Sequence, residues 1–235
     1  MSSFSEIKKG VYWFDGWDKK LTAGFSGREY PRDAYTAFLK ELELSGSKLV
    51  TLNQVHSANI IHVRNDFGQN KPSADGMLTT ERNIALGIWT ADCVPVYFFD
   101  PKHQVIGICH AGWKGTHFGI AEKMVQAMRQ NFESLAEEIQ VIMGPYIHRC
   151  CYEVGDEFAE IFPKAYKRKD KRSKGFMDLG AEISLRLMDE GVLKKNIQDT
   201  DLCTVCKNKK FYSYRAEPKT TERILSVISL KVKNN

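Results

Sequence analysis

The hydrophobic positions of this chain fall mainly into short runs that alternate with polar residues and are separated by turn-forming residues. That pattern is typical of β-strands. Runs rich in Val, Ile, Phe and Tyr predict strands at residues 11–14, 21–25, 60–63, 84–89, 94–99, 105–109, 139–143, 176–179, 211–215 and 224–230. The Asp-Pro-Lys-His segment at residues 100–103 has the composition of a tight turn. We therefore expect the strands on either side of it to form a hairpin.

Apolar residues at helical spacing mark fewer segments. The clearest is residues 116–131, where Ala121, Met124 and Met128 recur with polar residues between them. Shorter helices are predicted at residues 33–44, 156–165 and 181–190. Because hairpin-like strands lie in the middle of the chain and helices outside them, we expect an α+β fold. Its mixed β-sheets would be flanked by helices, unlike a doubly wound parallel sheet.

Length and composition describe an ordinary globular protein. The 235 residues contain no internal repeat and no linker-like segment, so we expect one compact domain spanning residues 1–235. The first twenty residues hold two Lys-Lys pairs and lack the apolar core of a secretory signal. No apolar stretch approaches the roughly 20 residues that a membrane span requires. We therefore expect a cytoplasmic protein with no membrane partner.

The positive charge is concentrated in one run. Of a net charge of +5, much lies in residues 164–174, where seven basic residues accompany one acid, Asp170. Tyr166 is the aromatic residue of this run, and no nucleic-acid-binding motif surrounds it. We interpret the run as a solvated loop and expect no nucleic-acid partner.

The chain has six cysteines, which in a cytoplasmic protein are more often thiols or metal ligands than disulfides. Cys203 and Cys206 form half of a zinc-ribbon pattern, but no second C-x-x-C completes it. Cys150 and Cys151 are adjacent, and adjacent side chains on extended backbone point apart. We therefore expect every cysteine except Cys93 to be a partly buried free thiol.

Three segments concentrate residue types that catalysis uses: Asn-Gln-Val-His ending at His56, Thr-Ala-Asp-Cys-Val-Pro around Cys93, and His-Ala-Gly-Trp-Lys-Gly beginning at His110. Cys93 lies between two predicted strands, and His110 follows a third. If the strands after Cys93 form a hairpin, Cys93 and His110 return to the same edge. His56 also precedes a strand, so all three side chains can converge.

Two imidazoles and one thiolate are a donor set that suits zinc. Three protein ligands leave one position of a tetrahedral ion open, as a catalytic zinc needs. The spacing by itself leaves a second interpretation open, in which Cys93 and His110 act without metal as nucleophile and base.

The strings T-A-D-C-V-P, H-A-G-W-K-G-T and G-P-Y-I-x-x-C-C-Y-E-V-G resemble the YfiH/LACC1-type purine nucleoside phosphorylase family, formerly described as multicopper polyphenol oxidases. The resemblance runs from Ala74 through Gly155 and resumes at Cys203 and at residues 211–215. It implies mixed sheets with helices outside, similar to a toxin family of cysteine deamidases.

The resemblance also implies a zinc ion, with copper less favoured, held by His56, Cys93 and His110. It implies phosphorolysis of adenosine, inosine, guanosine and methylthioadenosine, together with adenosine deamination, so the partners would be purine nucleosides and phosphate. Two segments depart from the family pattern. The one around Arg28 lacks a glycine pair, and the one after Arg215 lacks the usual second arginine.

Further residues are candidates for roles in such a reaction. Asp92 is a candidate proton carrier, or a partner that orients a ligand histidine. Arg28, Lys114 and Arg215 are candidates for binding phosphate, because phosphorolysis needs a cationic cradle.

Two rival functions remain open at this point: a copper-dependent phenol oxidase, and a Cys-His amidase or peptidoglycan-editing hydrolase. Copper centres of the first kind draw on many histidines, and this chain has six.

Overall fold

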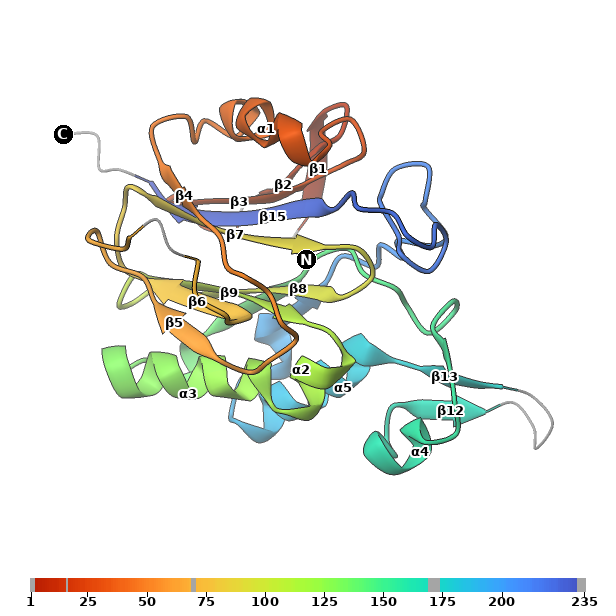
Figure 1. Ribbon diagram of the computed structural model, residues 1–235. Helices are drawn as coiled ribbons and strands as arrows, with labels where there is room; N and C mark the ends of the chain where they lie inside the picture. Colours follow the sequence, from red (N-terminus) through yellow and green to blue (C-terminus); the bar gives the residue numbers. More distant parts are fainter. Residues whose placement is uncertain (1–2, 16, 69–70, 169–173, 232–235) are drawn as a thin grey trace.

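The computed structural model describes residues 3–15, 17–68, 71–168 and 174–231. Two mixed β-sheets lie one on the other with helices on both outer faces (Figure 1). The first sheet has the spatial order β1 (Ser3–Lys8), β2 (Val11–Asp15), β3 (Leu21–Ser26), β15 (Ile224–Leu230), β7 (Ile84–Thr90) and β4 (Lys48–Val50). The second has the order β14 (Ile197–Asp199), β10 (Gln140–Met143), β8 (Val94–Asp100), β9 (Val105–Ala111), β6 (Gly76–Thr79) and β5 (Ile60–His62).

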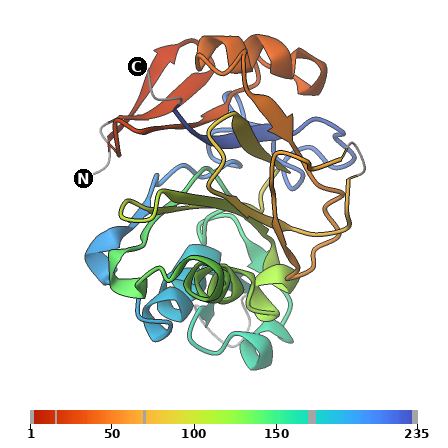
Figure 2. The same ribbon diagram turned by 90° about the vertical axis from the view of Figure 1, so that its left-hand side faces the viewer.

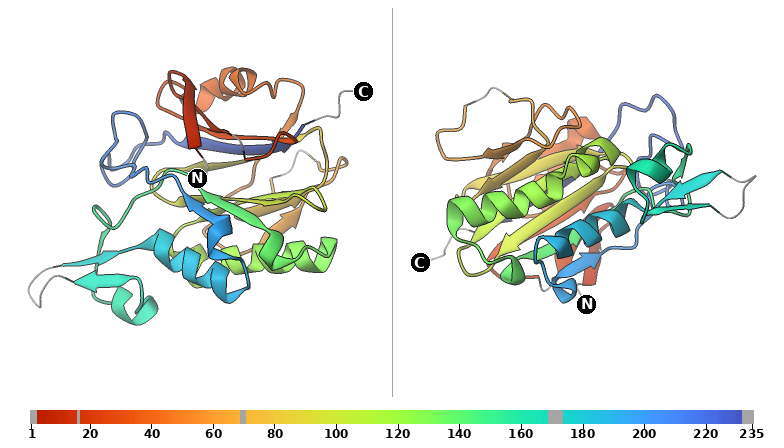
Figure 3. Two further views of the ribbon diagram at one scale, coloured as in Figure 1. Left: turned by 180° about the vertical axis from the view of Figure 1, so that it is seen from behind. Right: turned by 90° about the horizontal axis from the view of Figure 1, so that it is seen from below.

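Helices complete the outer layers, as Figure 2 shows from the side. Helix α1 (Tyr35–Glu41) covers the first sheet, and α2 (Trp113–His117), α3 (Ile120–Phe132) and α5 (Leu179–Asp189) cover the second. A small third sheet projects from the body beside α4 (Phe158–Ile161) (Figure 3). Its strands are β11 (Glu153–Val154), β13 (Gly175–Met177) and β12 (Tyr166–Arg168). The expected α+β fold with mixed sheets flanked by helices is confirmed.

Strand β8 shows why the sheets stack. Every residue of it is buried, so its two faces are both apolar, and alternate side chains point to opposite layers. Val96 and Phe98 pack toward the helices, whereas Tyr97 and Phe99 pack between the two sheets. The hydroxyl of Tyr97 donates a hydrogen bond of 2.8 Å to the carbonyl oxygen of Gly24 in the first sheet. That bond satisfies the phenol hydroxyl that this strand places between the two sheets.

Most predicted elements are present, including the hairpin of β8 and β9. The single helix predicted over residues 116–131 is divided into α2 and α3, because Gly119 between them has a left-handed φ of 78°. The strand predicted at residues 211–215 is wrong. Phe211 and Tyr212 are buried, but the backbone N–H of Arg215 donates to the carboxylate of Asp92 and not to a neighbouring strand.

The basic run at residues 164–174 is described only in part, since residues 169–173 lie outside the described residues. Its first part ends in β12, which pairs with β13. In the part of the chain that the structure describes, no helix is long and apolar enough to cross a membrane.

Candidate functional site

His56, Cys93 and His110 meet at one end of the second sheet. Cys93 lies in the turn before β8, and His110 lies in β9 opposite Pro95 of β8. The loop of His56 precedes β5. The nitrogen and sulfur atoms of the three side chains lie within 4.8 Å of one another. The convergence predicted from the hairpin is confirmed, while the role of these residues as metal ligands stays a prediction.

A buried carboxylate, Asp75, organises two of these three side chains. Its Oδ1 lies 2.8 Å from Nδ1 of His110 and accepts a 3.1 Å bond from the backbone N–H of His56. Its Oδ2 accepts bonds of 2.6 and 2.8 Å from the backbone and hydroxyl of Ser57. Burial by itself would raise the pKa of this carboxyl, but the bonds from His110 and Ser57 lower it to about 2. Asp75 is therefore ionised and holds the ring of His110 and the loop of His56.

The electrostatics differ at the two histidines. Burial lowers the pKa of His110, but the charge of Cys93 and the bond to Asp75 outweigh burial and raise it to about 9. The pKa of His56 is lowered, first by burial and then by the charge of His110. At neutral pH and without a metal ion, His110 is therefore protonated, whereas His56 is neutral. A neutral imidazole has the lone pair that a metal ligand needs.

The local structure leaves room for an ion between these side chains. A Cβ atom at Gly112 would lie 2.9 Å from Sγ of Cys93 and 2.9 Å from Nδ1 of His56, too close for either to keep its place. Because Nδ1 of His110 is engaged by Asp75, its Nε2 is the nitrogen left for a ligand. The residues present therefore fit a metal ion with three protein ligands and one open position.

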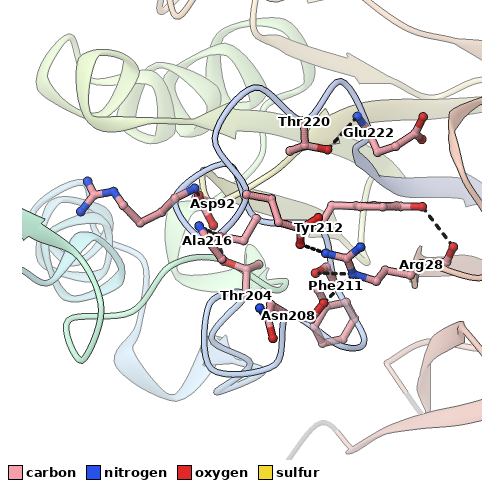
Figure 4. Close-up of polar contacts among 12 residues, drawn as sticks. Arg28, Asp92, Thr204, Asn208, Phe211, Tyr212, Ala216, Thr220 and Glu222 are labelled. Atoms are coloured by element: carbon pink, nitrogen blue, oxygen red, sulfur yellow. Dashed lines mark hydrogen bonds and ion pairs between the residues drawn. The ribbon is translucent and has the colours of Figure 1, made fainter.

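Asp92 adopts a left-handed φ of 89°, which is costly for a residue with a side chain. Its carboxylate accepts bonds of 2.6 Å from Oγ1 of Thr204 and 2.7 Å from the backbone N–H of Arg215, and these hold the conformation (Figure 4). The carboxylate that contacts a candidate ligand histidine is thus Asp75. A proton-carrier role for Asp92 stays a prediction.

A cavity of about 590 Å³ opens over the three side chains. This volume lies in the range of small-molecule sites. Its walls are partly aromatic, from Trp89, Trp113, Tyr152 and Tyr214, and partly cationic, from Arg32, Arg215 and Arg223. An aromatic and cationic cavity of this size can hold a flat polar ring together with an anion.

A family profile described as multi-copper polyphenol oxidoreductase laccase matches residues 31–231. The chain belongs to this family. A curated relative, a purine nucleoside phosphorylase of Clostridium acetobutylicum, is 36% identical over 77% of this chain and 76% of its own length. An adenosine deaminase of an unknown prokaryotic organism is 32% identical over 78% of this chain and 75% of its own length.

A solved structure has the same fold. The hypothetical protein YfiH of Bacillus licheniformis has a TM-score of 0.90 and 26% identity. The superposition covers 97% of this chain and 99% of that one. The two molecules therefore share the whole arrangement of sheets and helices.

In this member of the laccase family, the three predicted phosphate-binding residues occupy different places. Arg215 lines the cavity, whereas Arg28 and Lys114 are not among its lining residues. The guanidinium of Arg28 pairs with Glu217, donates to the carbonyl oxygen of Phe211 at 3.2 Å and lies over the ring of Tyr212 (Figure 4). The ammonium of Lys114 lies 5.5 Å from the ring of Trp113. Arg28 therefore ties loops together beside the cavity.

Sequence reasoning gave Arg32 and Arg223 no functional role. Asp75 stands in an Ala-Asp-Gly segment, which is compatible with a proton carrier or with a partner that orients a ligand histidine, but which slightly favours a turn residue. Arg32 and Arg223 come from distant parts of the chain and face the same cavity only after folding.

The expectation that Cys150 and Cys151 point apart is wrong. Both lie in a turn rather than on extended backbone, and the backbone N–H of Cys151 donates to the carbonyl oxygen of His148 at 2.9 Å. Their sulfur atoms lie within 4.8 Å of those of Cys203 and Cys206.

Proposed function

We propose that this protein is a zinc-dependent purine nucleoside phosphorylase that also deaminates adenosine, with one catalytic domain over residues 1–235. Its substrates would be adenosine, inosine, guanosine and methylthioadenosine. The observation that carries the proposal is the cavity in which His56, Cys93 and His110 lie beside aromatic and cationic side chains. The names of the relatives support it.

Phosphorolysis breaks the bond between ribose C1′ and the purine nitrogen and forms a bond between C1′ and a phosphate oxygen, while a proton goes to the departing base. A zinc ion on the three side chains would supply a Lewis acid at its open position. Asp75 would hold Nδ1 of His110, so that the ring keeps its orientation throughout the reaction.

The phosphate would be held by the arginines of the cavity. Arg215 is fixed by a 2.8 Å bond to the carbonyl oxygen of Glu153 and lies over the ring of Tyr152. Arg32 lies over the ring of Trp89. Because these guanidinium groups are already oriented, less rotamer freedom is lost when phosphate binds. The aromatic walls offer flat surfaces for the purine.

Deamination needs the same pocket but no phosphate. Water adds at C6 of adenine, ammonia leaves, and a proton moves from the water to the leaving nitrogen. Asp92 lines the cavity, and both of its oxygens already accept hydrogen bonds. We propose that it mainly positions Arg215 and the Thr204 segment.

A second function is favoured by one specific observation. Cys93, His110 and Asp75 lie in the order nucleophile, base and orienting carboxylate, as in a cysteine hydrolase: the Cys93 sulfur is within 4.8 Å of a His110 ring nitrogen, and Nδ1 of His110 is 2.8 Å from Asp75. The copper oxidase is less favoured, because copper centres of that kind draw on many histidines. Among the described residues, the candidate metal cluster that includes histidine contains two histidines.

The deciding experiment measures free base, ribose 1-phosphate and ammonia from a nucleoside panel, with and without phosphate, while zinc is quantified on the same sample. We expect ribose 1-phosphate only with phosphate, and loss of both activities after chelation, with recovery on adding zinc. The variant Cys93→Ala is the matched control and should show neither activity. Amide hydrolysis that survives chelation, without nucleoside turnover, would replace this proposal by the hydrolase.

A further inference from the structure

Four cysteines gather away from the His56 cluster, on the loops beside β10 and before β15. The Sγ atoms of Cys150, Cys151, Cys203 and Cys206 all lie within 4.8 Å of one another. Cys206 Sγ is 3.6 Å from Cys150 Sγ and 3.4 Å from Cys151 Sγ. In a tetrahedral zinc site with bonds of about 2.3 Å, neighbouring sulfurs are about 3.8 Å apart. The four sulfurs therefore already have nearly the spacing of such a site.

The backbone fixes this arrangement from two distant segments. The N–H of Tyr146 donates to the carbonyl oxygen of Leu202 at 3.1 Å, and the N–H of Thr204 donates back to Tyr146 at 2.9 Å. These bonds place Tyr146 beside Cys203. The turn at residues 149–151, which follows Tyr146, then brings Cys150 and Cys151 close to Cys203 and Cys206. The cluster thus rests on hydrogen-bonded backbone and not on side-chain placement alone.

The surroundings suit a metal-bound thiolate. Backbone N–H groups of His148, Val205 and Cys206 approach the sulfur of Cys203, where donors around a metal thiolate also lie. Cys203 is buried, whereas Cys150 and Cys206 are exposed, so an ion can enter from solvent. No disulfide joins cysteines in the described residues.

We propose that Cys150, Cys151, Cys203 and Cys206 bind a second zinc ion in a closed four-sulfur site. Four protein ligands leave no open position, so the role of this ion is structural. It would fasten the segment that supplies Thr204 to Asp92, and the loop that continues into the cavity-lining Tyr152. The site is separate from His56, Cys93 and His110, and the inference does not rest on the proposed nucleoside activity.

The test counts metal in the full chain, purified under reducing, oxygen-free conditions from zinc-supplemented cells. We expect about two zinc ions per chain, about one in Cys93→Ala, about one in Cys206→Ser, and none in the double variant. The variant Cys150→Ser, also at an exposed position, should match Cys206→Ser. Cys109 is buried and belongs to neither cluster, so it gives the control: Cys109→Ala should keep both ions.

A second readout uses Cys93→Ala, in which the four-cysteine cluster is intact. Loaded with cobalt(II), it should show the intense absorption of a tetrahedral four-thiolate site, and the double variant of Cys93→Ala with Cys206→Ser should lose most of that absorption. Removal of the ion from Cys93→Ala should lower its thermal unfolding midpoint. The proposal is overturned if Cys93→Ala binds neither zinc nor cobalt. It is also overturned if unfolded wild-type protein has two fewer free thiols than its sequence contains, which would mean a disulfide.

Discussion

The Oδ1 atom of Asp75 lies 2.8 Å from Nδ1 of His110, and the same carboxylate accepts hydrogen bonds from the loop that carries His56. One fully buried side chain thus sets the position of two of the three candidate metal ligands. The third, Cys93, is placed independently by the hairpin of β8 and β9. Asp75 is therefore the residue whose loss should disturb the site most without removing a ligand.

Asp75→Asn should weaken metal binding and reduce kcat about 10- to 100-fold, because the amide cannot replace both carboxylate oxygens. Metal affinity is measured by competition with a chelator, alongside steady-state kinetics. Asp100→Asn is the matched control, since Asp100 is equally buried and lies 2.7 Å from Nδ1 of His103 outside the cavity. Equal effects of the two substitutions on affinity would show that Asp75 acts only through stability.

Gly112→Ala should abolish metal binding, because the new Cβ would lie 2.9 Å from both Cys93 Sγ and His56 Nδ1. Zinc content and the unfolding midpoint are measured on the purified variant. Gly46→Ala serves as the control, since a Cβ there meets nothing within 4 Å. A Gly112→Ala protein with full zinc content would contradict the close packing of this site.

His56→Ala, Cys93→Ala and His110→Ala should each lose the active-site zinc and turnover while the fold remains. Metal analysis, circular dichroism and assays of both activities are made on the same preparations. His62→Ala removes a histidine that lies against Phe132 and should change neither zinc content nor turnover. Zinc retained at wild-type level in Cys93→Ala together with loss in His62→Ala would place the site elsewhere.

Arg215→Ala should lower phosphorolysis about tenfold or more while affecting deamination much less, because a charge-assisted hydrogen bond to phosphate is lost. The comparison is Arg28→Ala, which removes the ion pair with Glu217 and should reduce stability more than it changes the KM for phosphate. Kinetics with adenosine, with and without phosphate, separate the two. If both reactions fall equally in Arg215→Ala, this arginine binds the nucleoside or supports the fold.

The metal-free protein should lose stability at alkaline pH through His110. Its pKa in the folded protein is raised from 6.5 to about 9, so the stabilisation is complete below about pH 6.5 and is lost as the pH rises to about 9. The loss is at most about 3 kcal/mol. Urea unfolding in the presence of a chelator at pH 6 and pH 9.5 measures it, and His110→Gln should show a smaller difference. An equal difference in both proteins would assign the effect to other groups.

The sequence by itself determined the strands and the hairpin that depend on residues close together in the chain. Short apolar runs predicted β7, β8, β9 and β15, and the turn at residues 100–103 predicted the hairpin that brings Cys93 to His110. The register of a hairpin is set by its short turn and by which face of each strand is buried. Both depend on residues that are close together in the sequence. The same local signal misled at residues 211–215, where buried apolar residues form a loop.

Only the tertiary structure decided which polar groups act together. Asp75 contacts His110 because β6, which begins directly after Asp75, pairs with β9 in the sheet. Arg28 forms an ion pair with Glu217 and does not line the cavity. The four-cysteine cluster joins residues 150–151 to residues 203–206 through backbone pairing at Tyr146. Such contacts join segments far apart in the chain. Hydrophobic periodicity carries no information about them, since the polar side chains meet only after apolar burial has fixed the sheets.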